Sequence, residues 1–114
     1  MERTIDRATY QALVDTTGEE FVGELVDTFL AEAPTMLDDM RDALSRGDAD
    51  RFRRAAHSLK SNANTFGALK LGAMAKGLEL GGLDVARTAP GRPVDDAGAE
   101  FARAAAELQE LARG

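Results

Sequence analysis

The longest regular pattern of apolar positions in the chain runs from Phe21 to Leu44. Apolar residues recur there at the i, i+3, i+4 spacing of one helical face for more than six turns, at Phe21, Val22, Leu25, Val26, Phe29, Leu30, Ala33, Leu37, Met40 and Leu44. This pattern predicts a long amphipathic helix. Pro34 removes one backbone hydrogen bond, so we expect a kink or a short break near Glu32–Ala33.

Shorter patterns of the same period predict four more helices. Asp6 is suited to cap a first helix that ends near Thr16, before Thr17–Gly18. The other three helices are predicted over residues 49–66, from 69 to the Gly81–Gly82 pair, and over 94–112. Residues 84–93 contain Pro90, Gly91 and Pro93 and are predicted to form a loop.

These elements predict an all-α fold. We expect an antiparallel four-helix bundle with a short additional N-terminal helix, formed by one domain over residues 1–114. The chain shows no useful run of alternating apolar and polar residues, so strands are not expected.

Composition narrows the class of protein. The formal net charge of −6 disfavours binding to nucleic acid, whose phosphates require a basic surface. The absence of cysteine removes disulfides and thiolate chemistry, and no apolar run approaches the roughly 20 residues of a membrane span. Residues 1–6 lack the apolar core of a signal peptide, so we expect a cytoplasmic protein that does not enter membranes.

The only histidine, His57, occupies the polar side of the helix predicted over 49–66. On a helical wheel it lies about 150° from the centre of the stripe formed by Phe52, Ala56, Leu59, Ala63 and Phe66. We therefore expect its imidazole to point into water. Much of a histidine population is neutral near pH 7, and neutral imidazole is a competent nucleophile toward an activated phosphoryl group.

Residues near His57 on the helix suit such chemistry. Lys60 at i+3 and Arg53 at i−4 carry cations that can reach phosphoryl oxygens, and Asn64 at i+7 offers a hydrogen bond. Ser58 and Ser61 are small and would let a partner approach the ring.

The same residues also allow interpretations without a function. A surface histidine can be without function, and Arg51, Arg53 and Arg54 can form a solvated face. Gly67 can be a simple helix cap. One histidine without cysteine does not make a usual zinc site, so no metal ligand is assigned.

The segment Ala56-His57-Ser58-Leu59-Lys60, followed by Phe66-Gly67-Ala68 and Leu78-Glu79, resembles the histidine-containing phosphotransfer (HPt) domain family. The resemblance implies that His57 is phosphorylated and that Lys60 stabilises the phosphoryl group. Arg53, Ser58, Ser61, Asn64 and Gly67 complete the predicted site. Ser61 stands where the family often has glycine, which keeps that position small.

The resemblance also implies a function. The chain would be a phosphocarrier rather than an enzyme, accepting a phosphoryl group from an aspartyl phosphate on a response-regulator receiver domain and passing it to another receiver. It would need no cofactor of its own, because Mg²⁺ would sit in the receiver. A hybrid histidine kinase is a further candidate partner, and we expect a monomer. The alternatives are a helical adaptor that binds a receiver or kinase without transfer, and an enzyme that uses His57 as a general base.

Overall fold

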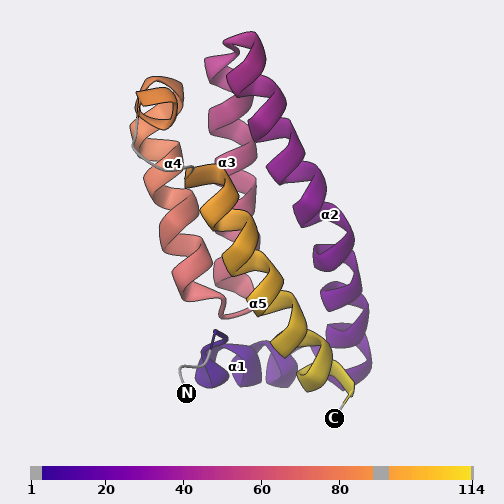
Figure 1. The fold of residues 1–114 in the computed structure, drawn as a ribbon. Coiled ribbons are helices and arrows are strands. Elements are labelled where there is room, and N and C mark those ends of the chain that lie inside the picture. The colour runs from indigo at the N-terminus through magenta and orange to yellow at the C-terminus, as the bar shows by residue number, and fades with distance from the viewer. Residues whose placement is uncertain (1–3, 89–92, 114) are drawn as a thin grey trace.

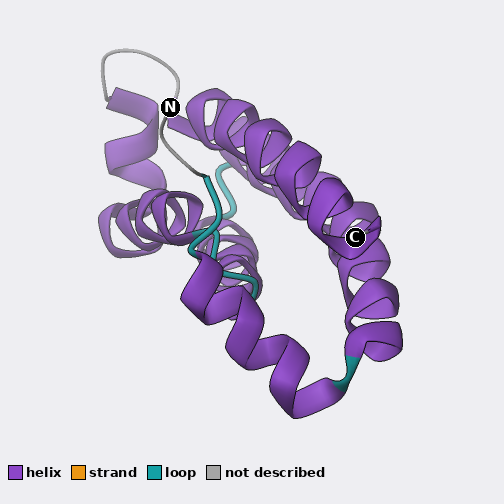
Figure 2. Ribbon diagram, turned by 90° about the horizontal axis from the view of Figure 1, so that it is seen from below, coloured by secondary structure: helices purple, strands orange, loops and turns teal. Residues whose placement is uncertain are grey.

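The computed structural model describes residues 4–88 and 93–113, and within these ranges the chain forms helices and no strand. The all-α prediction is therefore confirmed (Figure 2). The helices are α1 (Arg7–Thr17), α2 (Glu19–Arg46), α3 (Ala49–Thr65), α4 (Leu69–Thr88) and α5 (Pro93–Arg113).

Helices α2 to α5 form the predicted four-helix bundle (Figure 1). Each of them packs against the two that flank it around the bundle, so α3 lies between α2 and α4, and α5 closes the ring between α4 and α2. The short helix α1 lies across one end of the bundle, at the bottom of Figure 1. The bundle with one extra N-terminal helix is confirmed.

Local chemistry accounts for the helix ends. The Asp6 carboxylate accepts a hydrogen bond from the Thr9 backbone N–H at 3.1 Å and caps α1. Asp48 does the same for α3 through the backbone N–H of Arg51, at 3.1 Å. Gly47 ends α2 in the left-handed conformation, with φ 72°.

The core is built from the apolar faces that the sequence pattern predicts. Phe29 of α2 joins two other aromatic rings: it stacks on Phe66 at a centroid distance of 5.0 Å and lies perpendicular to Phe101 at a centroid distance of 5.6 Å. Phe52 and Leu59, on the inner side of α3, are completely buried. This packing holds α3 with its opposite side toward solvent.

The structure corrects two expectations about helix continuity. Helix α2 runs unbroken through Pro34, so the predicted short break near Glu32–Ala33 is wrong, and the kink that was its alternative stays a prediction. Pro34 is exposed, and inside the helix it removes only one backbone hydrogen bond, the one that the Leu30 carbonyl would otherwise accept.

The loop expected over residues 84–93 is also wrong for most of its length. Helical geometry is interrupted at Gly82, with φ 70° and ψ −170°, but the chain resumes a helix that continues to Thr88. Leu83 is buried, and the Arg87 guanidinium donates to the Leu44 carbonyl at 3.1 Å, which fixes this short helical extension against α2. Pro93 begins α5, and residues 89–92 lie outside the described part.

The segment before α1 is hydrogen-bonded to α5 and to the turn between α3 and α4. The Glu107 carboxylate of α5 accepts the backbone N–H groups of Thr4 and Ile5, each at 3.1 Å. The Asp6 N–H donates to the Gly67 carbonyl at 2.8 Å. Ile5 is buried, so this segment is part of the packed structure. None of the helices in the described ranges has the length and apolar character needed to cross a membrane.

Candidate functional site

His57 lies in the middle of α3 on the solvent side, as the sequence predicts. Its side chain is 58% exposed, whereas the neighbouring Ala56 and Leu59 are fully buried. The aromatic and aliphatic core therefore fixes the backbone at His57 while leaving the imidazole open to a partner.

A single carboxylate from α4 connects the two residues at the centre of the predicted site. Glu79 Oε2 lies 2.7 Å from His57 Nδ1, and Glu79 Oε1 accepts a hydrogen bond of 2.7 Å from Lys60 Nζ. Lys60 and Glu79 are more enclosed than His57, with 25% and 18% of their side chains exposed. The structure thus assembles a compact group of three from two neighbouring helices.

The contact with Glu79 determines where the imidazole proton resides. A carboxylate only accepts hydrogen bonds, so the Nδ1 contact requires a proton on Nδ1. In the neutral ring, Nε2 then carries the lone pair. Among residues 4–88 and 93–113, Nε2 has no hydrogen-bonding partner. The arrangement presents an oriented nucleophilic nitrogen to solvent.

Glu79 is held in its charged form. The hydrogen bond from Lys60, and next the one from His57, lower the pKa of the Glu79 carboxyl below its ordinary value of 4.5. Glu79 is therefore an anion at neutral pH and places a fixed negative charge beside Nδ1.

The remaining α3 residues of the predicted site lie around His57 without joining the Glu79 group. Ser58 and Ser61 are exposed, and their small side chains leave the ring accessible. Arg53 is also exposed and forms an ion pair of 2.8 Å with Asp50. Asn64 lies against Gly72 of α4, so it contacts the neighbouring helix on the side of the bundle that carries His57.

Gly67 lies apart from this group, beyond the C-terminal end of α3. It has φ 85°, it is buried, and its carbonyl accepts the Asp6 N–H. A Cβ at this position would lie 2.7 Å from the Asp6 carbonyl oxygen. The close approach of two backbone segments explains glycine here, and the structure does not bring Gly67 near His57.

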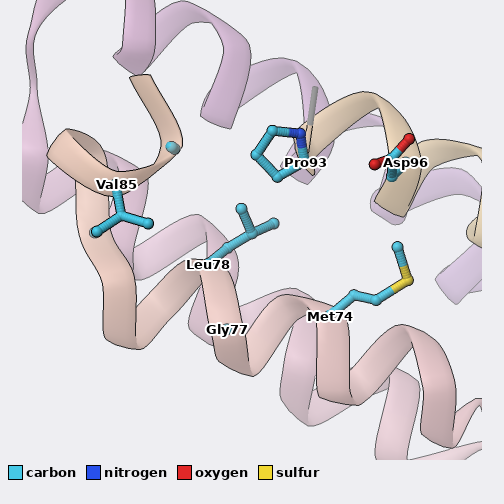
Figure 3. Close-up of a pocket in the computed structure, with 8 residues that line it drawn as sticks. Met74, Gly77, Leu78, Val85, Pro93 and Asp96 are labelled. Carbon is cyan, nitrogen blue, oxygen red and sulfur yellow. The ribbon is translucent and has the colours of Figure 1, made fainter. Parts of the chain in front are cut away.

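An apolar pocket of about 240 Å³ lies elsewhere on α4 (Figure 3). Met74, Leu78, Val85 and Pro93 line it, with Asp96 at its side. It lies between α4 and the start of α5, whereas Glu79 extends from α4 toward α3. Within the described residues, no group of three side chains is arranged to hold a metal ion.

Glu79 is the residue that sequence reasoning left without a role. The signal for it was present, since Leu78-Glu79 belongs to the motif on which the resemblance rests. Its partners were not evident, because they depend on how far α4 is shifted along α3.

Comparison with known families agrees with this site. The family model described as the Hpt domain matches residues 24–114, which include α3, α4, α5 and most of α2. No curated protein and no solved structure was found to match the chain. The match covers most of the chain and all three residues of the His57 group, and the chain therefore belongs to the Hpt domain family.

Proposed function

We propose that His57 is the phosphoryl acceptor and donor of this protein, with Nε2 as the reacting atom. Hpt domains act in phosphotransfer within phosphorelays, where they interact with receiver domains and histidine kinases. The observation that carries the proposal is the contact of 2.7 Å between His57 Nδ1 and Glu79, on a side chain that is 58% exposed. This contact supports a proton on Nδ1 and leaves Nε2 as the nitrogen that a partner can reach.

No proton has to move during the transfer of the phosphoryl group. Nε2 of the neutral ring attacks the phosphorus of an aspartyl phosphate, the N–P bond forms, and the P–O bond to the aspartate breaks. The aspartate leaves as a carboxylate. The phosphorylated ring keeps its Nδ1 proton and carries a positive charge, which Glu79 stabilises across the 2.7 Å contact. Transfer to a second receiver is the reverse sequence.

Lys60 supplies the cation of the His57 group. Its ammonium group binds the same carboxylate as the ring and still has two further N–H donors. These donors are available to the equatorial oxygens on which the transferred group carries its charge. Mg²⁺ is assigned to the partner receiver, so the chain itself contributes positioning and charge.

The source of the phosphoryl group is proposed to be a response-regulator receiver, and its destination a second one. The adaptor alternative differs in one respect, because it predicts binding without labelling. The intact His57, Lys60 and Glu79 group favours transfer.

Labelling from phosphorylated receivers tests the proposal. Receiver domains charged with radiolabelled acetyl phosphate are mixed with the wild-type chain and with His57→Gln. We expect acid-labile, base-stable label on the wild type only. The two proteins should unfold within about 0.5 kcal/mol of each other, since position 57 is on the surface. Label retained by His57→Gln would refute the assignment. Binding of a receiver without any transfer would support the adaptor.

A further inference from the structure

Charge is distributed very unevenly over this molecule. Between Arg7 and Arg41 the chain has no lysine, arginine or histidine. The same stretch holds eight acidic residues: Asp15, Glu19, Glu20, Glu24, Asp27, Glu32, Asp38 and Asp39. The exposed side of a helix usually carries both acidic and basic residues. A stretch that carries only acidic ones gives the surface that it forms a negative charge.

Three of these acids form one row along the outer side of α2. Glu20, Glu24 and Asp27 are separated by 4 and 3 residues, about one helical turn each, and all three are exposed. We call them the α2 acidic row. The buried residues Val22, Val26 and Met40 lie on the other side of the helix, so the row faces away from the core.

The surface around His57 has the opposite character. Arg54 lies one turn before His57 on α3, and Lys76 lies one turn before Glu79 on α4. Both are exposed, and within the described residues neither has an ion-pair partner. We call these two residues the basic rim. Arg53, by contrast, is neutralised locally by Asp50.

The row and the rim belong to different sides of the bundle. Arg51 marks the side of α3 that faces α2, because its guanidinium binds Asp39 at 2.8 Å. His57 follows six residues later, which turns it by about 120° away from that direction and toward α4. A partner that meets the imidazole therefore approaches a cationic surface on a protein whose net charge is −6.

We propose that the basic rim of Arg54 and Lys76 is the electrostatic docking element for the acidic surface around a partner's phosphorylated aspartate, and that the α2 acidic row turns such partners away from the wrong face. This inference rests on the proposed function. The reaction implies a negatively charged partner surface. An aspartyl phosphate bears negative charge, and carboxylates commonly hold the metal ion that accompanies a phosphoryl group. Opposed charges steer encounter and orient the partner before contact.

The test is a matched pair of charge variants that change the net charge equally. Arg54→Gln with Lys76→Gln removes the basic rim. Ala31→Glu with Thr35→Glu adds the same two negative units at exposed positions of α2, on the side of that helix that carries the acidic row. From a panel of receiver domains charged with acetyl phosphate, the one that transfers fastest to the wild type serves as donor. The second-order rate constant for transfer is measured at about 0.01 M and about 1 M salt, where the Debye length is about 30 Å and 3 Å.

We expect the rim variant to transfer about tenfold more slowly at low salt and at nearly the wild-type rate at high salt. The α2 variant should stay within about twofold of wild type at both. Circular dichroism confirms that both are folded. Equal slowing of both variants would mean that net charge alone acts, and an unslowed rim variant would remove the rim from docking. Either result overturns this inference while the wild type is still labelled at His57; only loss of that labelling would overturn the proposed function.

Discussion

Asn64 of α3 packs directly against Gly72 of α4, and a Cβ at position 72 would lie 2.0 Å from Oδ1 of Asn64. The two helices therefore also approach closely one turn beyond Lys60 on α3, at a position two turns before Glu79 on α4. The Asn64 side chain, rather than the backbone conformation, accounts for glycine at position 72.

Gly77 of the same helix provides the matched comparison, because a Cβ there meets no atom within 4 Å. Gly77→Ala should stabilise the protein by about 0.5–1 kcal/mol through helix propensity. Gly72→Ala should gain less, since Asn64 must move aside. Urea unfolding measures both. In an Asn64→Ala background the two substitutions should become equivalent, and a persistent difference would contradict the proposed contact.

Glu79 is expected to act on His57 as a positioning residue. Glu79→Gln keeps an acceptor for Nδ1 but loses the charge that holds Lys60, so phosphoryl acceptance should slow about tenfold. Glu79→Ala loses the acceptor as well, and a decrease of about 100-fold is expected.

Nitrogen-15 NMR of the imidazole separates positioning from a general structural effect. The Nδ1–H form should dominate in the wild type and in Glu79→Gln, and become mixed in Glu79→Ala. An unchanged tautomer in Glu79→Ala would show that Glu79 does not orient the ring.

Gly67 should matter for stability and not for transfer. Alanine at φ 85° costs about 1–2 kcal/mol, and its Cβ would also displace the Asp6 backbone 2.7 Å away. Gly67 lies ten residues beyond His57, about 15 Å along a helix. Gly67→Ala should therefore lower the free energy of unfolding measured in urea, yet transfer phosphoryl at the wild-type rate while folded. Slow transfer with native stability would place Gly67 in the site after all.

Acid should remove the cap of α1. The Thr9 hydroxyl, and then the Thr9 backbone N–H, lower the pKa of Asp6 below its ordinary value of 3.8. A carboxyl whose pKa is lower in the folded state stabilises the fold above 3.8, and this contribution is lost as the pH falls through the folded-state pKa.

Asp6→Ala should thus lower the urea midpoint at neutral pH, and its difference from wild type should shrink as the pH falls below 3.8. Asp6→Asn is the control, because asparagine caps helices without titrating in this range. A difference between wild type and Asp6→Ala that stays constant on acidification would rule out the capping role.

The sequence was sufficient where local pattern determines structure. The periodic apolar residues from Phe21 to Leu44 define α2, and the helical wheel places His57 in water. It failed where the outcome depends on contacts between distant segments. The predicted end of the helix at Gly81–Gly82 is confirmed as a break in helical geometry at Gly82. The loop predicted after it is wrong, because burial of Leu83 and the bond from Arg87 to Leu44 hold a second helical segment that continues to Thr88. The bridging role of Glu79 likewise depends on the register of α3 and α4, which a single helical pattern does not contain.

The two hydrogen bonds that Glu107 accepts from Thr4 and Ile5 join residues 103 and 102 positions apart. During synthesis Thr4 and Ile5 emerge from the ribosome long before Glu107, whose carboxylate binds them. The backbone N–H groups of Thr4 and Ile5 therefore stay without these acceptors until α5 has been made. The rest of the segment can dock earlier, because Gly67, which binds the Asp6 N–H, and the helices α2 and α3 precede α5 in the chain. The contacts with Glu107 are thus a late step that fastens an N-terminal segment already in place.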